Sequence, residues 1–247
     1  MNRFQALFMC LLTIFSCSAC NEAEHEFSDN GETGIEDVVP TGRVELTYMG
    51  QATLRVVTEE GKTIYIDPFS GDDYSLSADL ILITHEHFDH NAVDKVKNRN
   101  EGCRIIRSRD AIIDGKHQVF DLGYVTVEPV QAGFNRMHDH QRCVGYVLTF
   151  KNGKKVYASG DTSTTDQMRD GTMAAMNIDY AFLCTDGYYN MDNVEASKAA
   201  KMISAVHTIP YHNSVANDGY NFSDESAESF DAPNKLIVRP GETIDIK

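Results

Sequence analysis

Hydrophobic residues in this chain of 247 residues fall into short runs of strand length, separated by polar turns. The run at 80–83 is apolar at every position, which is typical of a strand covered on both faces. The segment 44–48 instead alternates, which predicts a strand with one face in solvent. Further strands are expected at 52–57, 63–66, 104–106, 124–130, 144–150, 155–159, 178–184, 206–211, 235–238 and 243–246.

Three segments have helical character, at 92–97, 164–176 and 193–203, the last opened by Asn193 as a possible N-cap. Strands interspersed with helices in a chain of this length predict one α/β domain, which we place at 43–247. The preceding acidic stretch at 21–42 has few apolar residues and predicts a flexible linker.

Residues 1–20 have the pattern of a targeting segment. Arg3 supplies a positive start, and the apolar core at 6–15 is too short for a permanent membrane span. Small residues before Cys20 resemble a bacterial lipoprotein cleavage site, although Cys17 stands where that pattern usually has Leu. Ordinary secretion with cleavage near Ala19 is the alternative. We therefore expect a signal peptide and a cell-envelope protein, periplasmic or extracellular, held to a membrane by a lipid on Cys20.

The net charge indicates the class of substrate, and the positions of the cysteines indicate whether disulfides are expected. With 22 basic and 37 acidic residues, the formal net charge is −15. Such a surface repels phosphate backbones, so we expect a small-molecule substrate and no nucleic acid. The three cysteines of the domain, Cys103, Cys143 and Cys184, lie in apolar runs and predict no disulfide framework.

The highest density of possible metal ligands follows the apolar run 80–83, in the sequence His85-Glu86-His87-Phe88-Asp89-His90. Imidazole and carboxylate are ligand types that suit a divalent ion such as zinc. On a tight loop His85 and His87 can converge on one ion, while Asp89 and His90 turn toward a second. A polar loop with chance histidines is the alternative, which the spacing H-x-H-x-D-H disfavours.

Later loops offer the remaining ligands. The first ion needs a third histidine, for which His138 and His140 are both candidates. Gly160 follows a strand and lets the backbone approach a metal closely, and Asp161 has two oxygens that can bridge ions held about 3.5–4 Å apart. His212 lies just beyond the strand that contains Pro210.

Together these residues resemble the metallo-β-lactamase superfamily. The resemblance implies an αββα sandwich, in which helices flank two mixed β-sheets, with a two-metal site at one edge. It selects His138, seven residues before Gly145, over His140. The flavodiiron branch has Glu at the position of His87, so the resemblance favours a hydrolase over a redox protein. The implied ligands are His85, His87 and His138 for one ion, Asp89, His90 and His212 for the other, and Asp161 for both.

Other residues are expected around these ligands. Asp67, in an Asp-Pro pair, is expected to hydrogen-bond a loop group and orient a ligand; a turn cap before Pro68 is the alternative. Gln51 stands where many relatives have a histidine and cannot titrate. Gln51 and His140 are expected behind the ligands, and a substrate pocket is expected at Asp186, Tyr188 and Tyr189, for which a structural turn is the alternative.

These residues predict a metal-dependent hydrolase. Two divalent ions, zinc with manganese as the alternative, lower the pKa of a shared water, and Asp89 guides its proton. The Asp67-Pro68 pair and the segment 160–163 resemble the branch that includes ascorbate-6-phosphate lactonase, which implies a small phosphoester, lactone or related ester as substrate. A β-lactamase is one alternative, disfavoured by His90 and by the lack of a Cys at 160–161. A metal-binding envelope lipoprotein without catalysis is another.

Overall fold

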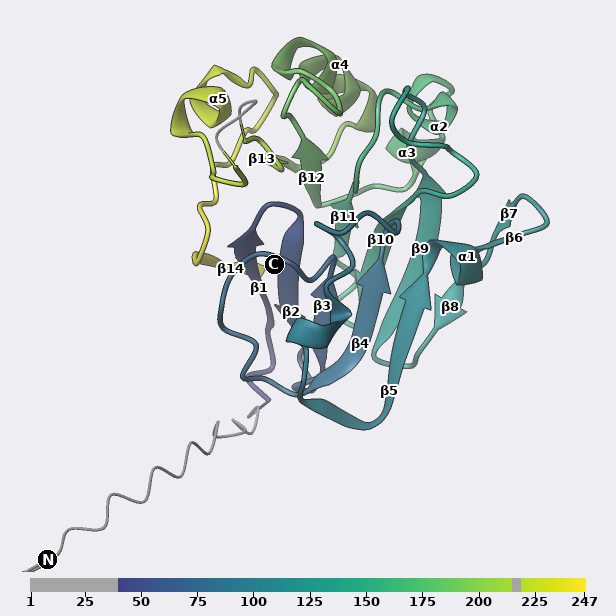
Figure 1. Ribbon diagram of the computed structural model, residues 1–247, viewed down its shortest axis with the longest axis vertical. Coiled ribbons are helices and arrows are strands. Elements are labelled where there is room, and N and C mark those ends of the chain that lie inside the picture. The colour runs from purple at the N-terminus through teal and green to yellow at the C-terminus, as the bar shows by residue number, and fades with distance from the viewer. Residues whose placement is uncertain (1–39, 215–218) are drawn as a thin grey trace, which may run out of the picture. The chain divides into compact units, whose positions relative to one another are not determined.

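Two six-stranded sheets form the framework of the protein in the computed structural model, which describes residues 40–214 and 219–247 (Figure 1). The first sheet has the order β14 (Thr243–Ile246), β1 (Val44–Gly50), β2 (Thr53–Val57), β3 (Thr63–Ile66), β4 (Ala78–Ile83) and β5 (Arg99–Arg107). The second has the order β13 (His207–Tyr211), β12 (Tyr180–Cys184), β11 (Lys155–Ala158), β10 (Val144–Phe150), β9 (Val125–Gln131) and β8 (Phe120–Asp121). A short ribbon pairs β6 (Ile112–Ile113) with β7 (Lys116–His117).

Both sheets are mixed. Strands β3, β4 and β5 are parallel neighbours, as are β11, β12 and β13, whereas the other neighbouring strands are antiparallel. Parallel strands end at the same edge of a sheet, so the loops that follow β3 and β4 lie together, and so do those that follow β11, β12 and β13. This arrangement positions the site described below.

Alternation along the strands builds the core between the sheets. In β1, Val44, Leu46 and Tyr48 are buried in the main core, whereas the residues between them are half-buried. The buried hydroxyl of Tyr146 in β10 donates to the carbonyl of Ile83 in β4 at 3.1 Å, which ties the two sheets together. The expected fold class, an αββα sandwich of two mixed sheets, is confirmed.

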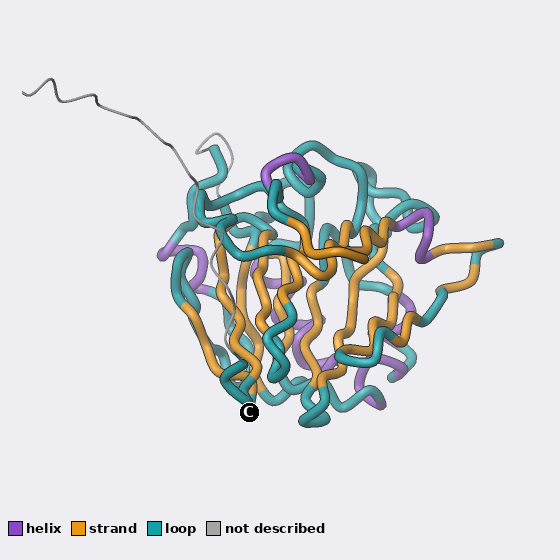
Figure 2. The backbone as a smooth tube through the Cα atoms, turned by 90° about the horizontal axis from the view of Figure 1, so that it is seen from below, coloured by secondary structure: helices purple, strands orange, loops and turns teal. Residues whose placement is uncertain are grey.

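The helices are few and short, and most lie at the periphery of the strands (Figure 2). They are α1 (Ser108–Ala111), α2 (Asp166–Arg169), α3 (Thr172–Ala175), α4 (Asn193–Ile203) and α5 (Asp224–Ser229). Helix α4 packs against β12, and α2 against β9. On the first sheet, the outer apolar face is covered by Tyr74 and by the 3-10 turn η1 (Val93–Lys95). The helical layer on that side is therefore reduced to a single turn.

The expected strand at 235–238 is wrong. Over this segment the structure has only an isolated bridge, between Thr208 and Lys235. The backbone carbonyl of Thr208 accepts from the N–H of Leu236 at 2.9 Å. To continue this ladder along β13, the next backbone donor would have to be Pro210, which has no N–H. The ladder stops there. On its other side Pro210 still pairs with Leu183 of β12, so the proline ends pairing on one side of the strand only.

Two helix expectations also change. The helix expected at 164–176 is divided into α2 and α3, because Gly171 between them has a φ of 86°, which a continuing helix cannot contain. The N-cap of α4 is Asp192, whose side chain accepts from the N–H of Glu195 at 2.7 Å, so the assignment to Asn193 is one residue late. The segment expected to be helical at 92–97 forms only η1.

The predicted signal segment, Cys20 and most of the predicted linker lie outside the described residues. No helix among the described residues is long and apolar enough to span a membrane.

Candidate metal centre

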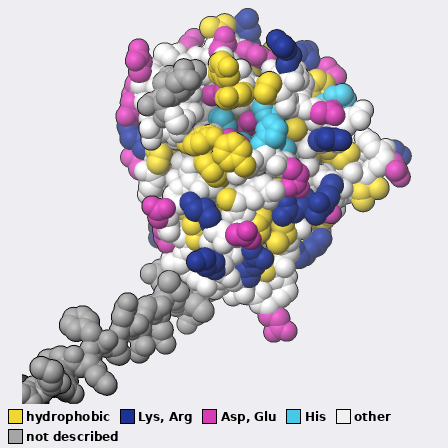
Figure 3. Space-filling model, viewed as in Figure 1, with side chains coloured by type: hydrophobic (Ala, Val, Ile, Leu, Met, Phe, Trp, Pro, Cys, Tyr) yellow, Lys and Arg dark blue, Asp and Glu magenta, His cyan; other side chains and the backbone are white. Residues whose placement is uncertain are grey.

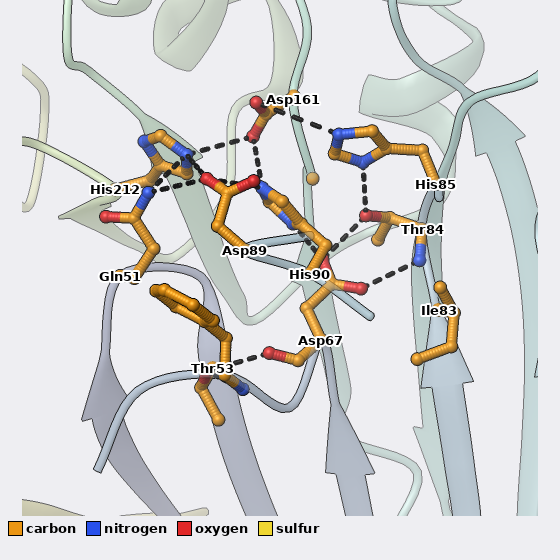
Figure 4. A network of polar contacts seen from close by, with 12 residues as sticks. Gln51, Thr53, Asp67, Ile83, Thr84, His85, Asp89, His90, Asp161 and His212 are labelled. Atoms are coloured by element: carbon orange, nitrogen blue, oxygen red, sulfur yellow. Dashed lines mark hydrogen bonds and ion pairs between the residues drawn. The ribbon is translucent and has the colours of Figure 1, made fainter. Parts of the chain in front are cut away.

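Loops from several strands bring the predicted ligands to one edge of the sheets. Figure 4 shows His85, Asp89, His90, Asp161 and His212 with their side chains pointing toward one another. Three groups of possible ligands have donor atoms within 4.8 Å of one another. The groups are His85, His87 and His138; His85, His90 and Asp161; and Asp89, His90 and His212. Every residue predicted as a ligand therefore falls in at least one group.

Asp161, which follows β11, lies at the centre of these groups and is buried. Its Oδ1 faces Nε2 of His90 at 3.2 Å and Nε2 of His212 at 3.3 Å. Its Oδ2 faces Nε2 of His138 at 3.1 Å and Nε2 of His85 at 4.0 Å. The two oxygens of one carboxylate thus face two different pairs of histidines.

A buried hydrogen-bond network behind the loop fixes which ring nitrogens face the site. Asp67, which follows β3, accepts from the Thr84 backbone N–H at 2.8 Å and from the Thr84 hydroxyl at 2.6 Å. Because the hydroxyl hydrogen is directed at Asp67, the Thr84 oxygen can only accept from Nδ1 of His85, which is 3.1 Å away. Asp67 also lies 2.8 Å from Nδ1 of His90. Both imidazoles therefore carry hydrogen on Nδ1 and turn Nε2 toward the site.

His138 is oriented in the same way by a residue that the sequence did not single out. The side-chain oxygen of Asn135 lies 3.1 Å from Nδ1 of His138 and accepts from the His138 backbone N–H at 2.9 Å. An amide oxygen can only accept, so Nδ1 carries the hydrogen and Nε2 faces Asp161. The spacing of three residues between Asn135 and His138 was the only available signal, and it is common in ordinary turns.

Burial and charge shift the pKa values of the clustered groups in different directions. Burial, and then the neighbouring His90, hold the pKa of His85 well below its usual value. Burial opposes a charge on His90, but the carboxylates of Asp161 and Asp67 outweigh it and raise the pKa of His90 well above its usual value. Burial would raise the pKa of Asp161, but His212 and His90 lower it well below its usual value. Asp161 is therefore ionised and attracts positive charge.

Gln51, in the turn between β1 and β2, contacts the side chains of two predicted ligands, as expected for a residue placed behind the ligands. Its Nε2 donates to Oδ2 of Asp89 at 3.1 Å and lies 2.8 Å from Nε2 of His212. The backbone carbonyl of Gln51 also accepts from the His212 N–H at 2.9 Å. Gln51, Asp67 and His212 all have positive φ values, of 50°, 46° and 43°, which are unfavourable for side-chain-bearing residues. Periodicity does not reveal such backbone strain.

These residues fit a divalent cation. Nε2 of His85, Nε2 of His90 and Oδ1 of Asp161 are buried without a hydrogen-bond partner among the described residues. Buried polar atoms are normally satisfied, and these three converging atoms can each offer a lone pair to a cation that displaces the proton of His90. Nitrogen and carboxylate oxygen are the donor types that zinc and similar ions take up in proteins.

A cavity of about 490 Å³ opens onto this cluster. The three residues predicted to form a substrate pocket, Asp186, Tyr188 and Tyr189, all line it. Phe88 and Tyr220 line it too, with ring centroids 5.9 Å apart. Aromatic side chains therefore form part of the cavity wall, as is common for sites that bind small molecules.

Several histidines and all three domain cysteines lie outside the cluster. His140, expected behind the ligands, instead turns to the surface: its side chain is 56% exposed and its ring lies 5.0 Å from that of Phe134. His207 stacks on Tyr180. Cys103, Cys143 and Cys184 are free thiols, and none belongs to a potential metal-binding group of the described residues.

Gly160 brings Asp161 close to the loop after β4, and its substitution should be costly. Its φ is 58°, and a Cβ there would lie 2.8 Å from Cβ of Thr84. We expect Gly160→Ala to lower the free energy of unfolding by about 2–5 kcal/mol, the sum of backbone strain and overpacking. Urea denaturation measures this. Gly153, with a φ of 79° and open space around it, is the control: Gly153→Ala should cost only about 1 kcal/mol. Equal losses of stability in the two variants would contradict the close approach of Gly160 to Thr84.

The fold and the site define the class of protein. Residues 45–212 match the family described as Beta-lactamase superfamily domain, which is more than half of the chain. The chain therefore belongs to this family, as its resemblance predicted.

Individual relatives narrow the class further. The chain is 29% identical over 200 residues to a UPF0173 metal-dependent hydrolase of Rubrobacter xylanophilus, covering 69% of this chain and 82% of that protein. It is 27% identical over 234 residues to another from a Geobacillus species, covering 82% and 100%. The crystal structure of a candidate metal-dependent hydrolase from Parabacteroides distasonis superposes with a TM-score of 0.63 at 27% identity, covering 81% and 94%. The predicted enzyme class, a metal-dependent hydrolase of the metallo-β-lactamase superfamily, is confirmed.

Proposed function

We propose that the protein is a dinuclear hydrolase that cleaves a small phosphoester, lactone or related ester. The observation that carries this proposal is the position of Asp161, whose two oxygens lie 3.1–4.0 Å from two separate pairs of histidine nitrogens. A carboxylate between two sets of ligands is suited to bridging two ions. We assign His85, His87 and His138 to one ion and Asp89, His90 and His212 to the other. Zinc is our first choice because histidine dominates both sets, with manganese as the alternative.

When bound, two such ions lower the pKa of a shared water and polarise the substrate oxygen. The protein residues supply orientation around them. Asp67, Thr84 and Asn135 hold His90, His85 and His138, respectively, with Nε2 toward the site. Asp89 is less deeply buried than Asp161 and lines the cavity, so it is the carboxylate placed to accept a proton from the attacking water.

The cavity supports a small organic substrate. Asp186, Tyr188 and Tyr189 stand at its wall, and two of them are exposed aromatic side chains able to cover a bound group. A β-lactamase is less well supported, because the potential metal-binding groups of the described residues contain no cysteine and position 90 is a histidine. Nitrocefin belongs in the substrate panel to test this alternative.

The test combines metal content with hydrolysis. The wild-type protein loaded with zinc or manganese should bind two ions per chain and hydrolyse aryl phosphodiesters, lactones or aryl esters. His87→Ala should lower kcat/KM by about 100-fold, comparable to the loss of one preorganised electrostatic group, and reduce the bound metal. His140→Ala is the matched control, because it removes an exposed histidine from outside the cluster and should change neither quantity. Full activity in His87→Ala would refute the proposed site.

A further inference from the structure

A second cavity, of about 450 Å³, opens on the other side of the histidine cluster. It shares three lining residues with the first cavity, namely His87, Met137 and His138. A molecule long enough to enter both cavities would therefore pass over the histidines assigned to one ion. On the space-filling surface the histidines lie between hydrophobic side chains on one side and Lys and Arg side chains on the other (Figure 3).

The two cavities differ in charge. The first has no Lys or Arg among its described lining residues, and its wall carries Phe88 and tyrosines. The second is lined by two arginines, Arg109 of α1 and Arg142 of the loop before β10. In a chain with a net charge of −15, two arginines beside the proposed site are a local exception.

These two arginines are also free to bind a ligand. Among the described residues neither guanidinium has an ion-pair or hydrogen-bond partner. The cavity contains two acidic side chains, and both are already engaged. Glu86 pairs with Arg107 at 2.7 Å, and Asp139 accepts from the Gln141 backbone N–H at 2.9 Å and lies 3.8 Å from Nδ1 of His140.

We infer that the second cavity binds an anionic group of the substrate, a carboxylate or a phosphate remote from the bond that is cleaved, between Arg109 and Arg142. Guanidinium groups match both anions in geometry and charge. The other end of the substrate, an apolar or ring-containing group, enters the aromatic cavity beside Tyr188 and Tyr189. This inference rests on the proposed hydrolase site and adds the substrate class: an ester or lactone with a separate negative charge.

Direct binding tests the arginines without turnover. The probe is benzenesulfonate, whose sulfonate coordinates metal ions weakly, and its neutral counterpart of similar shape is methyl phenyl sulfone. By calorimetry, the wild-type protein should bind benzenesulfonate about tenfold more tightly than the sulfone, as expected for charge-assisted hydrogen bonds at a partly exposed site. The double variant Arg109→Gln, Arg142→Gln should lose this preference. Arg169→Gln removes one positive charge from α2, outside both cavities, and should retain it.

Two results would overturn the inference: equal binding of both probes by the wild-type protein, or an undiminished preference in the double variant. Arg109→Lys with Arg142→Lys, which retains the charges, should keep part of the preference and shows that loss in the glutamine variant is not a folding defect. Both arginines are exposed, so circular dichroism should be unchanged.

Kinetics separates this inference from the proposed function. The paired substrates are 4-nitrophenyl hydrogen glutarate and its methyl ester. If the enzyme is a hydrolase with this subsite, the charged ester should have about a tenfold higher kcat/KM, mainly through KM, and the ratio should fall in the double glutamine variant. If neither ester is cleaved, the proposed reaction fails for esters while the sulfonate measurement still decides the anion site. Equal cleavage of both esters would contradict the proposed anion subsite but would leave the proposed hydrolase function standing.

Discussion

Replacing Asp161 with asparagine is expected to lower kcat/KM by roughly 10³-fold, more than any single histidine substitution, because this carboxylate faces both halves of the proposed centre. Asparagine has nearly the same volume, so the core around it should remain packed. It has no charge, however, and one of its two terminal atoms becomes an NH₂ group. That group would face either Nε2 of His138 at 3.1 Å or Nε2 of His90 at 3.2 Å, where a lone pair is required for metal binding.

The measurement pairs steady-state kinetics with metal analysis of the same preparation. The Asp161→Asn protein should retain at most one tightly bound ion per chain, since one set of histidines loses its shared oxygen. Asp94→Asn, at an exposed position of η1, removes the same charge away from the site and should keep full metal content and activity. An Asp161→Asn enzyme that binds two ions and hydrolyses substrate normally would exclude a bridging role for this residue.

Much of the fold could be predicted from hydrophobic patterning, because strands in this protein are either alternating or wholly apolar. The strand expected at 63–66 and the one expected at 144–150 have the observed bounds. Errors occurred where one atom decides the outcome. The missing N–H of Pro210 ends pairing with the segment at 235–238, and the left-handed Gly171 divides a helix whose composition is otherwise helical. Composition averaged over a window does not capture such effects.

The candidate site was predictable to a different degree for ligands and for the residues that orient them. The ligands occur in short sequence motifs directly after strands, so residues far apart in the sequence could be assigned to one site. Gln51 contacts two of the ligands from behind, as expected, whereas His140, two residues after His138, faces solvent, because spacing along a loop does not fix the direction of a side chain. Thr84 and Asn135 were missed, since a single hydroxyl or amide in a loop has no distinguishing pattern.

Replacing Asp67 with alanine is expected to lower the free energy of unfolding by about 3–5 kcal/mol, the range for removing one partner of a buried charged pair. Asp67 is fully buried and accepts three hydrogen bonds, of 2.6–2.8 Å, from Thr84 and His90. Alanine would leave the Thr84 N–H and the His90 Nδ1–H without partners in a dry environment. It would also have to adopt the positive φ of 46° found at this position.

A second buried aspartate separates this role from general stability. Asp79 accepts from the Thr63 N–H at 2.9 Å at the opposite ends of β3 and β4, away from the proposed metals. Asp79→Ala should therefore lower stability in urea denaturation without changing zinc affinity. Asp67→Ala should in addition weaken zinc binding by about 10- to 100-fold in competition with a chelator, because His85 and His90 lose the interactions that direct Nε2 toward the ion. If Asp67→Ala loses stability but keeps wild-type zinc affinity, then Asp67 supports only the fold, and the orientation of these two imidazoles is set by packing alone.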